Sequence, residues 1–508
     1  MGFFSKFMKS SFWPLLLVLL FVPTSSQEEG FISVVVSDKG LDFAKDLLIQ
    51  KTLSSIIPLQ LPQIKQSVKV PYLGKADVVL SHITVYTADV PSSFVETGQT
   101  GVVWVVSGAT AELSLDWSYS VESWLVEVSD HGTATVKMLN KFVSFSMFAS
   151  VLVKLVIGAM QLYDVSSMDA GVTVALENKA GTLKLSVLES GCHVRYLSIK
   201  MDGGGSWFYQ GLVDAFEDLI QSAIEDAVSD KISEGITTVD SVLHSLPKEF
   251  VVRDIAAMNV TLVNEPIVSK SSIELDINGL FTAADHLTSS FYHKRSEELV
   301  AYGASSKMVD ILLHEKVLDS ASLVLFNDGY MQWNVDEEQE QFLSSTSKWK
   351  YIIPRLYKMY PNDAMELNFS VSSPPIIRIS RNGIESTIYL DVTIDVLDFS
   401  EIVPVACIAL EITASISPKM AGNSLFGTLE LKDFAADLKW SKIGTLHISL
   451  IKPVMSLILK TVIVPYVNVK LLKGLPLPIL RGFTLQNAEI SCTDTKLVIS
   501  SDVSFHEQ

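Results

Sequence analysis

The chain has 508 residues, of which 39 are basic and 57 acidic, and 48% of its residues are hydrophobic. Its net charge of −18 argues against nucleic acid as a partner and against a polybasic membrane patch. The apolar content is high for a soluble protein, so we expect the excess to be buried or to contact an apolar ligand, which is a first indication of a lipid.

Residues 1–26 have the pattern of a secretory signal peptide. Two lysines precede the apolar run Phe12–Val22, and small residues precede the expected cleavage before Gln27. The mature chain, 27–508, then holds 37 basic and 57 acidic residues. We expect a protein that is secreted to the extracellular space and long enough for two domains.

Leu41–Ile57 is predicted to be the first helix, because its leucines and alanine repeat at helical spacing. Residues 68–86, 101–117 and 170–187 then alternate between apolar and polar side chains and are separated by turn residues. Consecutive hairpins of this kind predict a twisted antiparallel sheet that the first helix and a later, longer helix would cover.

The longer helix is predicted at Ser206–Leu246, where apolar residues recur every three or four positions and aspartates and glutamates lie between them. Gly235 is a possible bend inside it. Two interpretations fit the apolar face: plain packing on the sheet, or packing that also borders a bound ligand.

Met138–Asp164 interrupts the strand pattern. Without it, residues 133–137 would lead directly into the strand near 170 as a short hairpin. We interpret it as an insertion or a fault in the gene model, and its apolar run, which contains Lys154, is too short between charges to span a bilayer.

The second half repeats the order of elements, which predicts a duplicated unit. A link at 248–272 leads to a predicted helix at Ser306–Leu318, to strands beginning with Ser322–Val335, and to a late apolar helix near Leu450–Leu472. The predicted domains are 27–247 and 273–508.

No constellation for catalysis is found. There is no nucleophile elbow, the nine histidines are scattered, and the three cysteines lack metal-ligand spacing. We therefore predict no catalytic residue, no metal site and no cofactor. A lipid needs only enclosed apolar surface, because each methylene that leaves water contributes about 0.8 kcal/mol.

Two stretches carry a family resemblance. Gly40–Tyr86 resembles the N-terminal signature of the bactericidal/permeability-increasing and lipopolysaccharide-binding proteins, and Gly203–Ile236 is similar to the plant branch of that family. The resemblance implies an α+β fold: a boomerang of two similar barrels, each a highly twisted antiparallel sheet with two helices, joined by a central sheet. It also implies phospholipid in apolar pockets and lipopolysaccharide (lipid A) binding in innate defence.

Carried onto this sequence, the resemblance implies three sets of site residues. The pocket lining would be Leu41, Ala44, Leu47, Leu48, Phe216, Leu219, Ile220, Ala223 and Ile224. Phosphate groups of lipopolysaccharide would meet Lys65, Lys69 and Lys75. Independently of the resemblance, the Asn-x-Ser/Thr motifs at Asn259 and Asn368 predict glycosylation.

Two features depart from the family pattern. The partner that Cys192 would need near Val228 is not a cysteine, which leaves Cys407–Cys492 as the pairing to test. Residues 27–250 hold 27 acidic and 15 basic side chains, which disfavours a cationic lipopolysaccharide-binding surface.

The alternative to lipopolysaccharide binding is an extracellular interaction or lipid-transfer protein in which lipid is structural cargo, with peripheral membrane contact and an unidentified receptor. A lipid hydrolase is a third hypothesis.

Overall fold

The computed structural model describes most of the mature chain. The predicted signal peptide, and the suspected insertion beyond Met138, lie outside the described residues. The described ranges are 29–70, 74–98, 101–122, 127–138, 168–195, 197–202, 206–252, 255–283, 306–335, 344–398 and 401–506.

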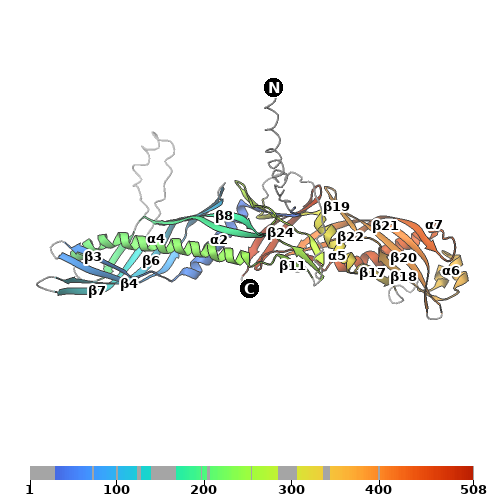
Figure 1. Cartoon of the computed structure of the whole chain (residues 1–508), viewed down its shortest axis with the longest axis horizontal. Helices are drawn as coiled ribbons and strands as arrows, with labels where there is room; N and C mark the ends of the chain where they lie inside the picture. Colours follow the sequence, from blue (N-terminus) through green and yellow to red (C-terminus); the bar gives the residue numbers. More distant parts are fainter. Residues whose placement is uncertain are drawn as a thin grey trace, which may run out of the picture.

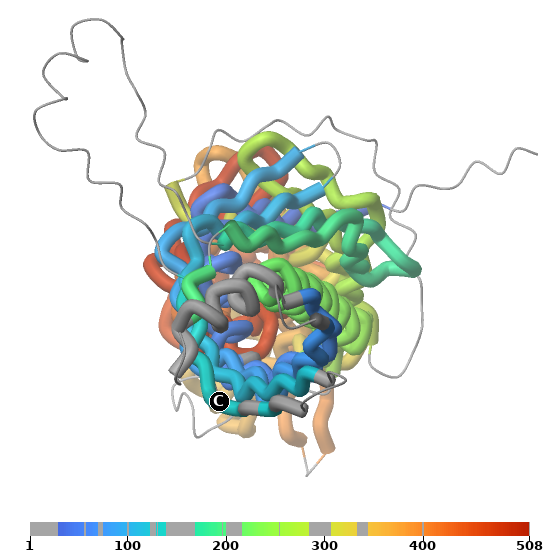
Figure 2. Tube along the Cα trace, turned by 90° about the vertical axis from the view of Figure 1, so that its left-hand side faces the viewer, coloured from blue at the N-terminus to red at the C-terminus, as the bar shows by residue number. Residues whose placement is uncertain are grey.

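The molecule is elongated, with a large antiparallel sheet towards each end and a smaller sheet between them (Figure 1). This arrangement confirms the predicted α+β architecture of two twisted barrels joined by a central sheet. In Figure 2, which looks along the molecule from the N-terminal barrel, the strands curve around an interior and the long helix runs along one side.

The N-terminal barrel is organised around β6 (Gly101–Glu122), which is paired along both edges. One edge pairs with β4 (Gly74–Asp89) and β5 (Ser92–Gly98), and the other with β7 (Glu127–Met138) and β8 (Met168–Lys179). The remaining strands are β2 (Leu59–Gln60), β3 (Ile64–Val70), β9 (Thr182–Val194) and β10 (Ser198–Asp202).

Strands β7 and β8 lie end to end and do not form the predicted hairpin. Met138 is opposite Ala111 and Met168 is opposite Ala109, so both strands use the same edge of β6. Met138 and Met168 therefore lie on the same line of strands.

The two helices of this half are confirmed. Helix α2 spans Asp38–Ile56, and Ser37 Oγ accepts a hydrogen bond from the backbone N–H of Gly40 at 3.4 Å. Gly40 is required by close packing, because a Cβ there would lie 2.3 Å from the carbonyl oxygen of Met308. Helix α4 spans Ser206–His244 and packs chiefly on β9.

The central sheet combines strands from distant parts of the chain. Its order is β13 (Ile267–Val268), β14 (Ser272–Ile277), β1 (Ile32–Ser37), β16 (Val309–His314), β25 (Lys496–Phe505) and β24 (Phe483–Cys492). Of the predicted link at 248–272, only β13 and the first residue of β14 belong to this sheet. Beside the sheet, β11 (Glu249–Val252), β12 (Ala256–Asn259) and β15 (Phe281–Ala283) form a three-stranded sheet.

The predictions for Ser306–Leu318 and Ser322–Val335 are wrong over most of their lengths. Residues Val309–His314 form β16, which lies between β1 and β25, and the helix α5 follows at Glu315–Asn327. A strand covered on both faces is apolar at nearly every position, so its hydrophobic pattern resembles that of a buried helix. Only β17 (Gln332–Val335) keeps the predicted strand character.

The C-terminal barrel contains β17, β18 (Ala364–Val371), β19 (Ile376–Ser380), β20 (Gly383–Asp398), β21 (Glu401–Ala421), β22 (Ser424–Ser441) and β23 (Leu475–Pro476). Its end carries the 3₁₀ turn η1 (Thr346–Trp349) and α6 (Pro354–Met359).

The late apolar helix is also confirmed. It runs continuously through α7 (Ile448–Ile458), the π-helical segment η2 (Leu459–Ile463) and α8 (Val464–Leu471). The π segment ends two residues before Pro465, which has no N–H to donate to the carbonyl four residues earlier, and a widened turn accommodates that loss. The helix therefore continues past a proline.

Candidate functional site

Helices α2 and α4 cover the inner face of β5, β6, β8 and β9. Leu41 of α2 is buried with Val102, and Ile236 of α4 is buried with Val174. Trp104 packs against both groups. One tryptophan of β6 thus packs against an apolar cluster of each helix.

Several apolar side chains on this inner face remain partly exposed, although they point between the helices and the sheet. On β6 they alternate with outward positions, as Val102 and Trp104 do. We call this set the Trp104 cluster; its partly exposed members are Val95, Trp104, Leu176, Leu185, Val187 and Ile232. These side chains therefore keep accessible apolar surface on this face.

Two polar atoms on this face have no hydrogen-bond partner. They are Nε1 of Trp104 and Oγ1 of Thr97, both buried at the atom level. Thr97 is opposite Val102 and Val95 is opposite Trp104 across β5 and β6, which places both groups on one face. A buried unpaired donor costs about 1–3 kcal/mol, so a ligand oxygen at this position would relieve a real penalty.

Helix α2 is fixed on the sheet by a buried lysine that the apolar pattern did not reveal. Lys45 is only 5% exposed, and its Nζ lies 2.5 Å from Asp42 Oδ1 and 3.1 Å from the carbonyl oxygen of Ser93. Burial opposes the charge, yet the hydrogen bonds that Lys45 donates to Asp42 and Asp46 leave its pKa raised. The apolar face of α2 therefore includes a paired charge.

The predicted lining residues of α4 lie farther from α2 than expected. Phe216, Ile220 and Ile224 are fully buried in the barrel core, with Leu219 partly buried beside them. Ala223 is half-buried. Phe216 precedes Ile236 by 20 residues, or about 30 Å of helix.

The predicted lining residues of α2 are nearer to the interior space. Leu41 is buried, while Ala44, Leu47 and Leu48 are half-buried. The structure therefore does not bring the two predicted groups into one cluster. Ile232 and Ile236 take the place of the earlier α4 residues. Trp104 could not be distinguished from other apolar strand residues until its distant neighbours were known.

The three predicted phosphate-contact lysines lie together on the β3–β4 hairpin. Lys65 and Lys69 share one face of β3, and Lys75 is directly opposite Lys69. All three side chains are exposed. Asp77 lies on the same face opposite Ser67, whose hydroxyl donates to its carboxylate, so a negative charge stands among the lysines.

All three cysteines are free thiols, so the predicted Cys407–Cys492 bridge is not formed. Cys407 is buried in β21 of the C-terminal barrel, whereas Cys492 ends β24 of the central sheet. Burial, reinforced by Glu225 and Asp169, raises the pKa of Cys192 to about 12.

The other predicted sites are placed as follows. Asn259 ends β12, and its Oδ1 accepts hydrogen bonds from the N–H and hydroxyl of Thr261. Asn368 is half-buried in β18. Within the part of the chain that the structure describes, no group of three or more histidine, cysteine, aspartate or glutamate side chains is arranged to hold a metal ion.

Comparison with known proteins gives a consistent result over both halves. Residues 40–246 match the N-terminal domain of the LBP / BPI / CETP family, and residues 251–505 match its C-terminal domain. A putative BPI/LBP family protein of Arabidopsis thaliana is 44% identical over 490 residues, which cover 96% of this chain and 95% of that protein.

More distant relatives extend the match to animals. A bactericidal permeability-increasing protein of Sebastes schlegelii is 23% identical, covering 97% of this chain and 98% of the relative. The human lipopolysaccharide-binding protein is 20% identical, covering 92% of each chain. A crystal structure of lipopolysaccharide binding protein superposes with a TM-score of 0.61 at 17% identity, covering 94% of this chain and 100% of the other.

Proposed function

The chain belongs to the LBP / BPI / CETP family, and from this premise we propose that it is a secreted, non-enzymatic protein that holds phospholipid between its helices and sheets. The Trp104 cluster is the observation that carries the proposal. It combines partly exposed apolar side chains with two buried polar atoms that lack partners. An acyl chain would cover the former, and an ester oxygen could accept from Trp104 Nε1.

We further propose that lipid A is a ligand, contacted through its phosphates by Lys65, Lys69 and Lys75 in a role in innate defence. Relatives named for lipopolysaccharide binding motivate this assignment. The three lysines are exposed on one hairpin, as such a contact requires, although Asp77 reduces their combined charge. We expect modest affinity that falls with rising salt concentration.

The phospholipid proposal is tested on protein purified from a eukaryotic host. We expect organic extraction followed by mass spectrometry to release phospholipid in stoichiometric amount, and delipidated protein to take up a fluorescent phospholipid. Protein that carries no lipid and takes up none would refute the proposal.

The lipid A proposal needs its own variants. Lys65, Lys69 and Lys75 are changed together to glutamate, and saturable binding of lipid A is measured by calorimetry. The matched control changes Lys179, Lys270 and Lys419, which are also exposed, so that both variants have the same net charge. Equal affinity of the two variants would remove the hairpin from the binding site while leaving the phospholipid proposal intact.

A further inference from the structure

The far end of the C-terminal barrel is basic, in contrast to the rest of the chain. Residues 344–362 and 438–473 contain no aspartate or glutamate, although the whole protein has a net charge of −18. We call this surface the C-terminal basic end; its basic residues are Lys348, Lys350, Arg355, Lys358, Lys442 and Lys452, and Lys460 lies about 12 Å farther along the late apolar helix. Asp363, Asp398 and Glu401 lie at the same end, because Ala364 is opposite Leu397 and Asp398 is opposite Glu401, so the basic side chains are in excess but not alone.

The two segments form one continuous part of the molecule. Trp349 and Leu356 of the first segment share a buried core cluster with Leu446 and Ile451 of the second. Figure 1 shows α6 at the end of the barrel with α7 beside it. The charges of the first segment, together with Lys442 and Lys452, therefore belong to the same end of the barrel, whereas Lys470 and Lys473 lie at the other end of the late apolar helix, near β23.

Large apolar side chains are exposed among these charges. Tyr351 is 83% exposed, more than any other large apolar side chain described. The others on this surface are Met359, Leu450 and Leu457, each at least half exposed. Exposed apolar residues interspersed with an excess of basic over acidic residues are typical of a surface that lies in a membrane interface.

The helix Ile448–Leu471 is apolar and long enough to cross a bilayer, yet only 28% of its most apolar window is buried. Its inward side, which includes Met455 and Ile458, is buried in the barrel core. Extraction of the helix would expose that core, so the helix fits a position parallel to the membrane surface.

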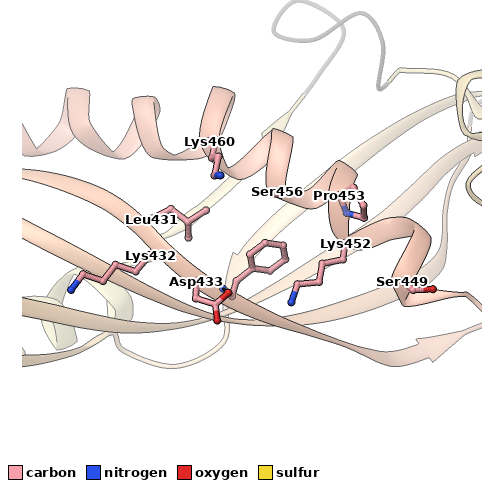
Figure 3. Close-up of a pocket in the computed structure, with 9 residues that line it drawn as sticks. Leu431, Lys432, Asp433, Ser449, Lys452, Pro453, Ser456 and Lys460 are labelled. Carbon is pink, nitrogen blue, oxygen red and sulfur yellow. Dashed lines mark hydrogen bonds between the residues drawn. The ribbon is translucent and has the colours of Figure 1, made fainter.

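A cavity of about 370 Å³ lies between this helix and β22. Lys452, Lys460, Ser449 and Ser456 line it from the helix, and Lys432 and Asp433 line it from the strand side, so three lysines face one carboxylate (Figure 3). Lys452 Nζ lies 5.2 Å from the centre of the Phe434 ring. Ammonium and hydroxyl groups around a small cavity are suitable donors for a phosphate headgroup.

We propose that the C-terminal basic end docks onto bilayers of anionic phospholipid. Tyr351, Leu450 and Leu457 enter the interface, while the long lysine side chains reach headgroup phosphates from the same surface. The proposal is independent of the phospholipid held at the Trp104 cluster and of lipid A at the β3–β4 hairpin, because its residues lie on the other barrel.

The charge component is tested by vesicle flotation of the full mature protein. Vesicles of phosphatidylcholine alone are compared with vesicles that also contain phosphatidylglycerol, and we expect binding only to the latter. Changing Lys358, Lys452 and Lys460 together to glutamate should weaken binding at least about tenfold, since each lysine near an anionic surface contributes roughly fivefold. The control triple Lys179, Lys270 and Lys419 to glutamate should bind like the unaltered protein.

The apolar component is tested by changing Tyr351 and Leu457 to aspartate. The matched control changes Leu188 and Val242, which are exposed to 55% and 57% on the other barrel, to aspartate. We expect only the first pair to lose vesicle binding at unchanged melting temperature. Failure of the unaltered protein to bind anionic vesicles, or retention of binding by both C-terminal variants, would overturn the proposal. Loss of binding only in the Lys65, Lys69 and Lys75 variant would assign docking to the opposite barrel.

Discussion

Leu41 of α2 and Ile236 of α4 are connected through Trp104, which packs against the apolar cluster of each. The two helices are far apart in the sequence. The neighbour that their clusters share is Trp104, whose buried indole N–H is unpaired. This relationship makes the indole of Trp104 the most direct probe of whether the interior is built for a ligand.

Trp104→Phe is expected to separate ligand binding from folding. The change keeps an aromatic ring and removes Nε1, which has no partner in the protein. Retention of phospholipid should fall about fivefold, the worth of one hydrogen bond of roughly 1 kcal/mol, while the melting temperature of lipid-free protein should not fall, because the N–H that is removed is unpaired there. Both are measured on delipidated and reloaded protein.

Trp117→Phe is the matched control for that experiment. Trp117 Nε1 donates to the carbonyl oxygen of Thr133 at 3.2 Å inside the barrel core. Its removal should destabilise the lipid-free protein by about 1 kcal/mol without a specific effect on lipid retention. If the two variants behave alike, Trp104 is an ordinary core residue.

The sequence was sufficient where the pattern is local. Helical spacing predicted α2, α4 and the late apolar helix, because each buries one stripe along its length. The prediction from sequence failed at Val309–His314. Both faces of this strand are covered, so its apolar residues follow neither the helical nor the alternating strand period. The site was harder still, because the neighbours of Trp104 come from β5, β8, α2 and α4.

The phosphate contact of Lys65, Lys69 and Lys75 was implied by the family resemblance and stays a prediction. The structure places Lys65 and Lys69 on one face of β3 and Lys75 directly opposite Lys69 on β4. The same register puts Asp77 between them, which could have been inferred once the hairpin turn was fixed. Cross-strand pairing, and not composition, determines the local charge that a ligand would meet.

Glu315→Ala is expected to destabilise the junction of β16 and α5. The Glu315 carboxylate is buried, and it accepts hydrogen bonds from the backbone N–H of Ile379 and from Arg378 Nη1, both at 2.9 Å. Its loss leaves a buried N–H unpaired and should cost about 1–3 kcal/mol, measured by calorimetry.

Asp494→Ala is the comparison for Glu315→Ala. Asp494 pairs with Arg381 at 3.1 Å, but both side chains are at least 70% exposed. We expect less than about 1 kcal/mol for this change. A larger loss from Asp494→Ala than from Glu315→Ala would contradict the assignment.

Cys192 should be nearly inert in the folded protein. Its pKa of about 12, compared with an ordinary 9.0, lowers the thiolate fraction near neutral pH by about 1000-fold. Iodoacetamide should therefore modify Cys192 only after denaturation, as measured by peptide mass spectrometry. Rapid modification of the native protein would show that the thiol is not buried as described. Glu225→Gln should change the reactivity of Cys192 little, because burial is the main cause of its raised pKa.

Asp502 should make part of the stability depend on acid pH. Lys39 Nζ of α2 lies 2.7 Å from Asp502 Oδ1 of β25, and Lys307 Nζ lies 3.4 Å from Oδ2. The hydrogen bond from Lys39 lowers the pKa of Asp502 below its ordinary value of 3.8, against the opposing effect of burial. The carboxylate thus contributes stability that is fully present above the unfolded pKa and is lost as pH falls through the lower, folded pKa.

The corresponding measurement compares the melting temperatures of the unaltered protein and Asp502→Asn across this range. The unaltered protein should be the more stable above about pH 5, by a constant margin, because both folded and unfolded carboxylates are then ionised. Below 3.8 the margin should shrink as Asp502 gains a proton in the folded state too. Lys39 lies in the first turn of α2, so its ion pair with Asp502 joins that helix to the central sheet. If the stability difference between the two proteins grew on acidification, the ion pair would not be what secures the helix.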